Sequence, residues 1–417
     1  MSKKFINCER DISSAQALKV VMAELTQLGL DCQYKCAGST FKTYHCKLID
    51  PINKCIFYGC GKGIGIQSKV SATFEAFEHY YSYKLATDIK HDALKFMSYA
   101  EVIAHGSKPL LADLLPNRML MDETWEVTLP WVEFLSFQNR KKFYYPLFLV
   151  EPRYLEFNNK FMADKFNYQH LCALSCDSGT SSGTSFVEAA IHGLNECIER
   201  DACSIFLVES FLKQRPIHLI DKLTLPENLL NYVKLIEAEF ADELAIVDIT
   251  SDIQIPTFCV AFTRQKVLIQ AKGYGTSLSK DYALERALLE ALQPLHLRNE
   301  NLAQAEKDVV QNLAPYPDLQ SAAVADLGQM IVDGNFVRKS FQDIEDPIQK
   351  HMGTSSQLSE IMRRIKAVGL VPHYMHLTEK KNSVTCLKVI VPGMDNFFLV
   401  SDGKLVLPGK RALSAIN

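Results

Sequence analysis

Glutamates recur at helical spacing in this 417-residue sequence. Glu75 and Glu78 lie three residues apart, as do Glu196 and Glu199, so each pair falls on one face of a helix. Mg2+ prefers carboxylate, phosphate and water oxygens, and enzymes use it to hold nucleoside triphosphates. A single glutamate pair is also typical of a solvated helix surface. The pairs alone leave both a solvated surface and a metal–phosphate site open.

Three segments share one order, in which a Gly-rich stretch and small hydroxyl residues precede a charged helix. They are GCGKGIGIQSKVSATFEAFEHYYSYK (59–84), DSGTSSGTSFVEAAIHGLNECIERDACSIF (177–206) and KGYGTSLSKDYALERALLEALQ (272–293). The glycines predict loops whose backbone N–H groups can approach phosphate closely, although the first segment is not a Walker A loop. The repetition of this order favours a metal–phosphate site.

Other polar residues in the three segments extend the predicted site. Lys62, Arg200 and Arg286 would neutralise charge that develops on a transferred phosphoryl group. The remaining polar residues on the predicted helix faces are Ser71 in the first segment, Glu188 and Asn195 in the second, and Glu290 and Gln293 in the third.

The elements around these segments predict one large mixed α/β unit. Ser13-Ser14 precedes an apolar periodic run that ends at Gly29, which predicts a helix. Residues 303–350 are polar and contain Pro315 and Pro317, so we expect an irregular segment, either a mobile lid-like insertion or an ordered surface loop. Strands are expected near 44–48, 55–58, 131–135, 143–150, 245–250, 257–262, 373–377 and 385–391, and further helices near 230–240 and 358–368.

Composition and charge argue against several other classes of protein. Lys and Arg number 45 against 48 Asp and Glu, and a net charge of −3 disfavours general nucleic-acid binding. No run approaches the roughly 20 apolar residues of a membrane helix, and no apolar stretch follows the basic N-terminus as it would in a secretory signal. We therefore expect a cytoplasmic protein with reduced cysteines. The spacings Cys32/Cys36 and Cys172/Cys176 are not usual for zinc.

At the three segments, the sequence resembles the YcaO family over about residues 55 to 395. The family is known by loop-helix motifs of the types GKG…SA..EA.ERY, G..EA...L.E.IERDA and G.G……A..RAL.E..Q. The matching residues are Gly61-Lys62-Gly63, Ser71-Ala72 and Glu75 to Tyr80; Glu188-Ala189, Leu194, Glu196 and Ile198 to Ala202; and Arg286-Ala287-Leu288, Glu290 and Gln293. All three motifs occur in the family's order.

The resemblance implies a YcaO-type ATP-binding fold with three Gly-rich loop–helix units packed on β-sheets. Residues 55–417 would form the catalytic domain, and residues 1–54 would belong to the same unit. It implies ATP and Mg2+ as cofactors. The implied metal ligands are Glu75, Glu78, Glu196 and Glu199; the implied nucleotide contacts are Lys62, Ser71, Arg200, Arg286 and Gln293, with Glu188 and Glu290 as further site carboxylates.

The implied reaction is ATP-dependent activation of a backbone amide in a precursor peptide. A nucleophile adds to the amide carbon, the resulting oxyanion attacks the γ-phosphate, and phosphate then leaves. An adjacent Cys, Ser or Thr side chain gives a thiazoline or oxazoline, which is the expected product, whereas a sulfur donor gives a thioamide. The alternative of another class is a non-catalytic scaffold or regulator, and the intact set of carboxylates argues against it.

Three features depart from the family pattern or leave the reaction open. His79 stands where the first motif usually has arginine. The chain ends VLPGKRALSAIN, without the PxPxP tail common in azoline-forming members, which keeps the thioamide reaction open. About 50 residues precede the first motif, too few for a typical domain of their own. We therefore expect a separate partner that binds a leader peptide or delivers sulfur, and a homodimer is also open.

Four further residues are not assigned to the site. Asp248, at a predicted strand end, is more typical of a turn cap, and Trp131 is left without a functional role. His373 and His376 are three apart on a predicted strand, so they should point to opposite faces and have separate structural roles.

Overall fold

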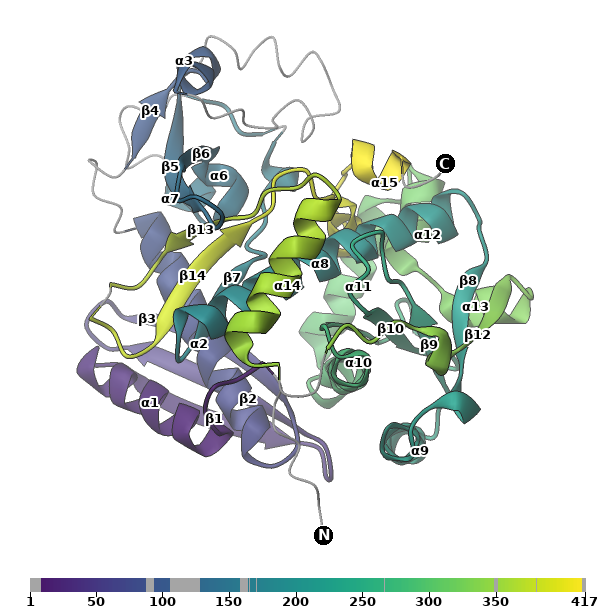
Figure 1. The fold of residues 1–417 in the computed structure, drawn as a ribbon. Coiled ribbons are helices and arrows are strands. Elements are labelled where there is room, and N and C mark those ends of the chain that lie inside the picture. Colours follow the sequence, from purple (N-terminus) through teal and green to yellow (C-terminus); the bar gives the residue numbers. More distant parts are fainter. Residues whose placement is uncertain are drawn as a thin grey trace.

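Three β-sheets, each with a long helix packed against it, surround the centre of the molecule in the computed structural model (Figure 1). The three long helices, α2, α8 and α10, approach one another at this centre. Among the described residues, no helix is both long and apolar enough to cross a membrane. The structure describes residues 9–87, 94–105, 128–157, 164, 166–169, 171–265, 267–348, 352–379 and 381–414.

The first sheet is an antiparallel meander in the order β1-β2-β3. The predicted first helix is confirmed, because Ser13 caps it in a capping box with Gln16. The turn at residues 51–54 joins two paired strands, so the expected boundary at residue 54 falls inside one hairpin. The elements are α1 (Ser14–Gln27), β1 (Asp31–Ala37), β2 (Lys42–Asp50), β3 (Cys55–Gly63) and α2 (Ile66–Thr87).

The second sheet has the order β4-β5-β13-β14-β7, and β6 pairs with β5. Helix α8 packs on β14 and β7, and α14 packs on α8. The strand expected at residues 143–150 is partly wrong, because the chain turns into a short helix after Pro146. The elements are β4 (Lys95–Met97), α3 (Tyr99–Ala104), β5 (Leu129–Ser136), β6 (Lys142–Pro146), α6 (Leu147–Val150), α7 (Tyr154–Phe157), β7 (Thr180–Gly183), α8 (Phe186–Leu207), α14 (Thr354–Ala367), β13 (His373–His376) and β14 (Thr385–Ile390).

The third sheet has the order β11-β10-β9-β8-β12, with β12 parallel to β8 and the other pairs antiparallel. Helix α10 packs on β11 and β10, and α9 contacts α10. All residues of β9 and β10 are buried. The elements are β8 (Ile217–Asp221), α9 (Glu227–Phe240), β9 (Leu244–Asp248), β10 (Thr257–Phe262), β11 (Lys272–Thr276) and α10 (Lys280–His296).

The irregular insertion expected at residues 303–350 is wrong for the part that the structure describes. It contains most of α11 (Glu300–Asn312), together with α12 (Pro317–Val324), α13 (Leu327–Val332) and β12 (Phe336–Ser340). Pro317 occupies the first turn of α12, where its missing N–H and fixed φ favour a helix start. Leu319 and Leu327 are buried in a shared core, so the polar stretch is a packed part of the fold. Short helical turns complete the chain: η3 (Cys172–Leu174), η4 (Val208–Leu212), η5 (Lys222–Thr224), η6 (Phe341–Asp343), η7 (Phe397–Asp402) and α15 (Lys410–Ser414).

The predicted Gly-rich loops are mainly strands in two of the three segments. Gly61 lies in β3 and Gly273 in β11, and each faces the helix that follows its strand. A Cβ on Gly61 would lie 2.0 Å from the carbonyl oxygen of Ser68, and one on Gly273 would lie 2.2 Å from that of Ala287. These glycines therefore let a helix lie directly on its strand, which is a packing role rather than the phosphate contact expected from the sequence.

Replacement of Gly61 by alanine should lower the free energy of unfolding by about 2–4 kcal/mol, because the new methyl group meets the backbone of α2. Urea unfolding followed by circular dichroism measures the change. Gly353→Ala is the matched control, since nothing lies within 4 Å of its Cβ position, and it should change stability by less than about 1 kcal/mol. Equal stability of the two variants would contradict the packing role of Gly61.

Candidate nucleotide and metal site

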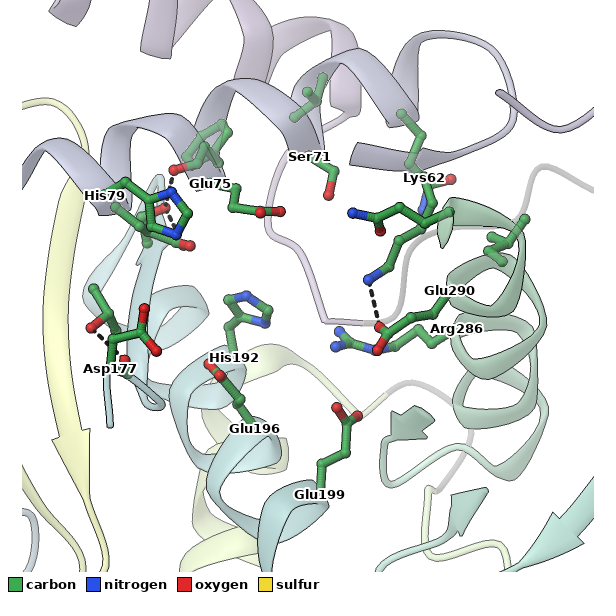
Figure 2. A pocket seen from close by; sticks show the side chains of 18 of the residues that line it. Lys62, Ser71, Glu75, His79, Asp177, His192, Glu196, Glu199, Arg286 and Glu290 are labelled. Carbon is green, nitrogen blue, oxygen red and sulfur yellow. Dashed lines mark hydrogen bonds and ion pairs between the residues drawn. The ribbon is translucent and has the colours of Figure 1, made fainter. Parts of the chain in front are cut away.

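A cavity of about 900 Å3 lies where α2, α8 and α10 face one another (Figure 2). Its volume is at the upper end of the range for pockets that enclose a whole small ligand. The structure brings eleven of the sequence-predicted site residues to this one cavity: Lys62, Ser71, Glu75, Glu78, Glu188, Glu196, Glu199, Arg200, Arg286, Glu290 and Gln293. Their individual roles stay predictions. Asn195, which was predicted to share their helical face, does not line the cavity; it is buried and donates to Glu9 at 3.0 Å.

The α2 wall contributes two acidic side chains and a hydroxyl group. Ser71 and Glu75 point toward the cavity from this helix (Figure 2). Glu78 accepts a 2.7 Å hydrogen bond from the hydroxyl of Ser182 on β7, which ties the first unit to the second. Burial raises the pKa of Glu75, and it raises that of Glu78 well above its usual range. Both carboxylates therefore lie where an uncompensated negative charge is disfavoured.

The α8 wall carries the second glutamate pair. Burial raises the pKa of Glu196, although Arg200 opposes the rise. Burial raises the pKa of Glu199 to about 7, and the charge of Glu290 adds to the effect. One oxygen of Glu199 is buried and has no hydrogen-bond partner among the described residues. A buried acceptor without a partner is costly unless a ligand completes it.

Glu188 lines the cavity, but its oxygens already have partners. One accepts a 2.6 Å hydrogen bond from the backbone N–H of Asp11. The other accepts from the N–H and the hydroxyl of Thr184, each at 2.8 Å. These bonds anchor the N-terminal segment and the start of α8, so a structural role accounts for this carboxylate.

The α10 wall supplies both signs of charge. The ammonium group of Lys62, on β3, donates to Glu290 at 2.5 Å and so links the first unit to the third. Burial would raise the pKa of Glu290, but the Lys62 ammonium outweighs this effect and the net shift is downward. The Nε of Arg286 is buried without a hydrogen-bond partner among the described residues. Lysine and arginine therefore offset part of the acidic charge.

These properties fit Mg2+ and a nucleotide as ligands. The glutamates provide hard oxygen ligands, and the partnerless atoms of Glu199 and Arg286 leave a buried acceptor and a buried donor for a ligand. In the part of the chain that the structure describes, no three His, Cys, Asp or Glu side chains form a ready-made metal cluster. Mg2+ in nucleotide sites is commonly held by one or two carboxylates together with phosphate and water oxygens.

Several residues that line the cavity were not predicted. His192 lies one helical turn before Glu196 on α8, so helical spacing could have revealed it. Burial lowers its pKa well below the usual range, and Arg286 adds to the effect, so the ring is held neutral. Asp177 also lines the cavity. It is an acidic residue at the start of the second Gly-rich segment, and this position could have identified it as a site residue. Arg10 comes from the N-terminal segment, which carries no motif.

The residues left unassigned have structural partners. Asp248 accepts from the N–H of Thr250 at 3.0 Å, as a turn cap should, and it also binds Lys339 at 2.6 Å. The indole N–H of Trp131 donates 2.8 Å to the carbonyl of Met97. His373 is buried and His376 is exposed, which agrees with their expected opposite orientations.

The model of YcaO cyclodehydratases, a family that binds ATP and Mg2+, matches residues 60–395. The chain therefore belongs to the YcaO family, and ATP and Mg2+ are its cofactors. An uncharacterized protein of Methanothermobacter thermautotrophicus is 28% identical over 238 residues, which are 53% of this chain and 56% of that protein. The match thus spans little more than half of the relative's length.

Two solved structures share the fold. YcaO from Methanopyrus kandleri, bound with AMPPCP and Mg2+, has a TM-score of 0.65 and 18% identity, and the alignment covers 97% of each chain. A heterocyclase in complex with substrate and cofactor also has a TM-score of 0.65, with 17% identity over 94% of this chain but only 54% of the heterocyclase. At these identities the likeness concerns the fold.

Replacement of Glu199 by glutamine should stabilise the ligand-free protein at pH 8. Because the pKa of Glu199 is raised from 4.5 to about 7 in the folded state, ionisation of this side chain lowers the free energy of unfolding. The loss of stability is absent near pH 4.5, grows as the pH rises and is complete above about pH 7. The variant should gain about 1–3 kcal/mol at pH 8 and almost nothing at pH 4.5. Unfolding curves in EDTA measure this difference. Exposed Glu300→Gln should stay within about 0.5 kcal/mol of the parent, and a loss of stability for Glu199→Gln at pH 8 would contradict the argument.

Proposed function

We propose that this chain uses ATP and Mg2+ to activate backbone amides of a peptide. The observation that carries the proposal is the convergence of the predicted residues from three separate segments on one cavity. The family match supports the same cofactors. In this proposal Glu75, Glu78, Glu196 and Glu199 hold Mg2+, and Lys62, Ser71, Arg200, Arg286 and Gln293 contact the nucleotide.

The chemistry explains why a nucleotide is needed. An amide oxygen is a very poor leaving group, and transfer of the γ-phosphoryl group to it produces phosphate as the leaving group instead. Phosphoryl transfer depends mainly on positioning and on compensation of charge, both of which fixed cations supply. Arg200 and Arg286 line the cavity. Acidic side chains lie near both guanidinium groups and keep them charged despite their burial.

We propose cyclodehydration of Cys, Ser or Thr to thiazoline or oxazoline as the reaction. The nucleophile is then the neighbouring side chain, and the peptide loses the elements of water while ATP becomes ADP and phosphate. The heterocyclase of the same fold is in complex with substrate and cofactor, which supports a peptide-modifying reaction. ATP-dependent thioamidation uses the same amide activation with an external sulfur nucleophile, so the mass of the product separates the two.

A separate partner protein is part of the proposal. This chain aligns with only 54% of the heterocyclase chain, whereas it aligns with 97% of the Methanopyrus kandleri protein. The heterocyclase therefore carries a large additional region beyond the shared fold. We propose that a second protein supplies leader-peptide binding or sulfur delivery here, and a homodimer stays a prediction.

Incubation of the protein with ATP, Mg2+, the candidate peptide and its partner should release phosphate and change the peptide mass. Loss of about 18 Da indicates an azoline, and gain of about 16 Da indicates exchange of oxygen for sulfur. Glu75→Ala and Glu199→Ala should each weaken ATP binding at least about tenfold, because the cation bridging the phosphates loses a ligand. EDTA should have the same effect on the parent protein.

Exposed Glu300→Ala is the matched control and should bind ATP as the parent does. Unchanged ATP affinity in both site variants would mean that these glutamates do not hold the cation that accompanies ATP, and would overturn the proposed metal site. Strong ATP binding without any change in peptide mass, tested with partners encoded nearby, would favour the scaffold alternative.

A further inference from the structure

We call the cavity of about 900 Å3 between α2, α8 and α10 the nucleotide cavity. A second cavity adjoins it on the side of the turn η7. It has a volume of about 230 Å3 and is lined in part by residues 175–178, Tyr274 and η7, and we call it the η7 cavity. Asp177 and Arg200 line both cavities. These two side chains therefore stand at the junction of the two spaces.

The apolar part of the nucleotide cavity lies away from Asp177, on the side of α10. Helix α2 runs along it from Ser71 through Glu75 to His79, and Asp177 lies beside His79 (Figure 2). The apolar lining comes from α1 and the segment before it, from α2, and from the C-terminal part of α10 with the segment beyond it: Ile12, Ala17, Val70, Phe74, Leu289, Pro294, Leu297 and Leu302. A nucleoside bound among these residues would direct its terminal phosphate toward Asp177 and Arg200, where the η7 cavity begins.

Arg200 is equipped to act at this junction. Its guanidinium carbon lies 5.0 Å from the ring centre of Phe398 in η7, which places the cation against the wall of the second cavity. Its buried Nε has no hydrogen-bond partner among the described residues. A fixed cation with an unused donor can contact an oxygen that approaches the terminal phosphate from the η7 cavity.

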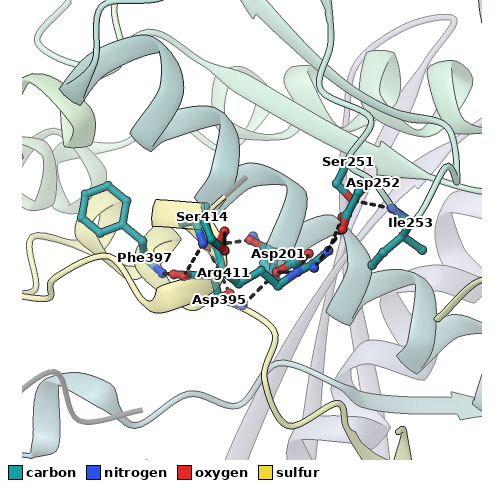
Figure 3. A network of polar contacts seen from close by, with 11 residues as sticks. Asp201, Ser251, Asp252, Ile253, Asp395, Phe397, Arg411 and Ser414 are labelled. Atoms are coloured by element: carbon teal, nitrogen blue, oxygen red, sulfur yellow. Dashed lines mark hydrogen bonds and ion pairs between the residues drawn. The ribbon is translucent and has the colours of Figure 1, made fainter. Parts of the chain in front are cut away.

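A polar network fixes η7 to α8 beside Arg200 (Figure 3). Asp201 is fully buried and accepts from the Nε of Arg411 at 2.9 and 2.8 Å and from the N–H of Asp395 at 2.9 Å. Asp395 in turn accepts from the N–H groups of Phe397 at 2.9 Å and Ala412 at 3.1 Å. The wall of the η7 cavity is therefore held in a constant position relative to the residues of the nucleotide cavity.

We propose that the η7 cavity is the acceptor subsite, which takes one residue of a peptide together with its preceding backbone amide. In phosphoryl transfer the attacking and leaving oxygens are roughly in line, so the acceptor must approach the terminal phosphate from the side opposite the nucleotide. With the nucleoside among the apolar residues named above, the η7 cavity lies on that side. This inference rests on the proposed function, because it assigns the second reactant of the same site.

The size and lining of the η7 cavity suit a short piece of polypeptide. Its 230 Å3 is below the roughly 300–1,000 Å3 of pockets that enclose drug-sized ligands, so it fits one residue rather than another cofactor. Ser178, Ser401 and Asp402 offer hydrogen-bonding side chains, and Phe398 and Leu399 offer apolar contact. An amide with a small polar side chain needs this combination.

Binding of N-acetyl-L-serine methylamide, a minimal acceptor, tests the proposal. Saturation-transfer NMR in the presence of AMPPCP and Mg2+ should show binding to the parent protein. Ser401→Trp fills the η7 cavity and should reduce the saturation-transfer signal at least about fivefold, while the affinity for AMPPCP stays within about twofold of the parent. Ser178→Phe fills the cavity from the wall that residues 175–178 form and should have the same effect.

Leu407→Trp is the matched control. Leu407 lies in the same C-terminal segment but lines a different cavity, of about 400 Å3, so both ligands should bind this variant as they bind the parent. The inference is overturned if the parent binds AMPPCP but not the amide, or if a folded cavity-filling variant binds the amide as the parent does. Failure of the parent to bind AMPPCP with Mg2+ would instead overturn the proposed function.

Discussion

Negative charge gathered where water has little access is the constraint on which the centre of this molecule depends. Burial raises the pKa of Glu78, Glu196 and Glu199, so the ligand-free protein holds carboxylates in an environment that disfavours their ionised form. Lys62 compensates Glu290 directly, and the arginines offset more of the charge. In the proposed function a divalent cation relieves the remaining excess on binding, so affinity for the cation and stability of the fold would be linked.

The carboxylates meet because three strand–helix units are packed closely enough to share one space. Each acidic helix lies on a strand of its own sheet, and in the first and third units glycines on the strand remove the side chains that would hold the helix away. Contacts between units then set the relative positions of the helices. The Ser182–Glu78 hydrogen bond joins the first unit to the second, and the Lys62–Glu290 ion pair joins the first to the third.

Helical spacing predicted most of the helical side chains that share the cavity, because an α-helix fixes the relation between residues three and four apart. It failed for Asn195, which donates to Glu9 instead of lining the cavity. It was not sufficient to predict what each atom contacts. Glu188 lies on the same helical face as Glu196 and Glu199, yet its oxygens are taken by Thr184 and by Asp11, which is 177 residues away. The glycine pattern was ambiguous for a similar reason, since close approach to phosphate and close approach to a helix both require a residue without a side chain.

Long-range packing also explains the error at residues 303–350. That stretch is polar and contains prolines, so its local pattern alone favours a loop. It forms helices instead, because its few apolar residues pack against η4 and η7 and are buried there. The η7 cavity could not be predicted at all. Its walls come from residues 175–178, Arg200, Tyr274 and η7, and no spacing rule relates segments so far apart in the chain.

The order of the three units along the chain has a consequence for biosynthesis. The first acidic helix leaves the ribosome about 200 residues before α10, which carries Arg286 and Glu290, and the segment containing η7 follows a further hundred residues later. A nascent chain therefore cannot form the complete cavity until most of the protein has been translated. The first two units can meet earlier, through the contact of Ser182 with Glu78, but the cavity lacks its α10 wall until then.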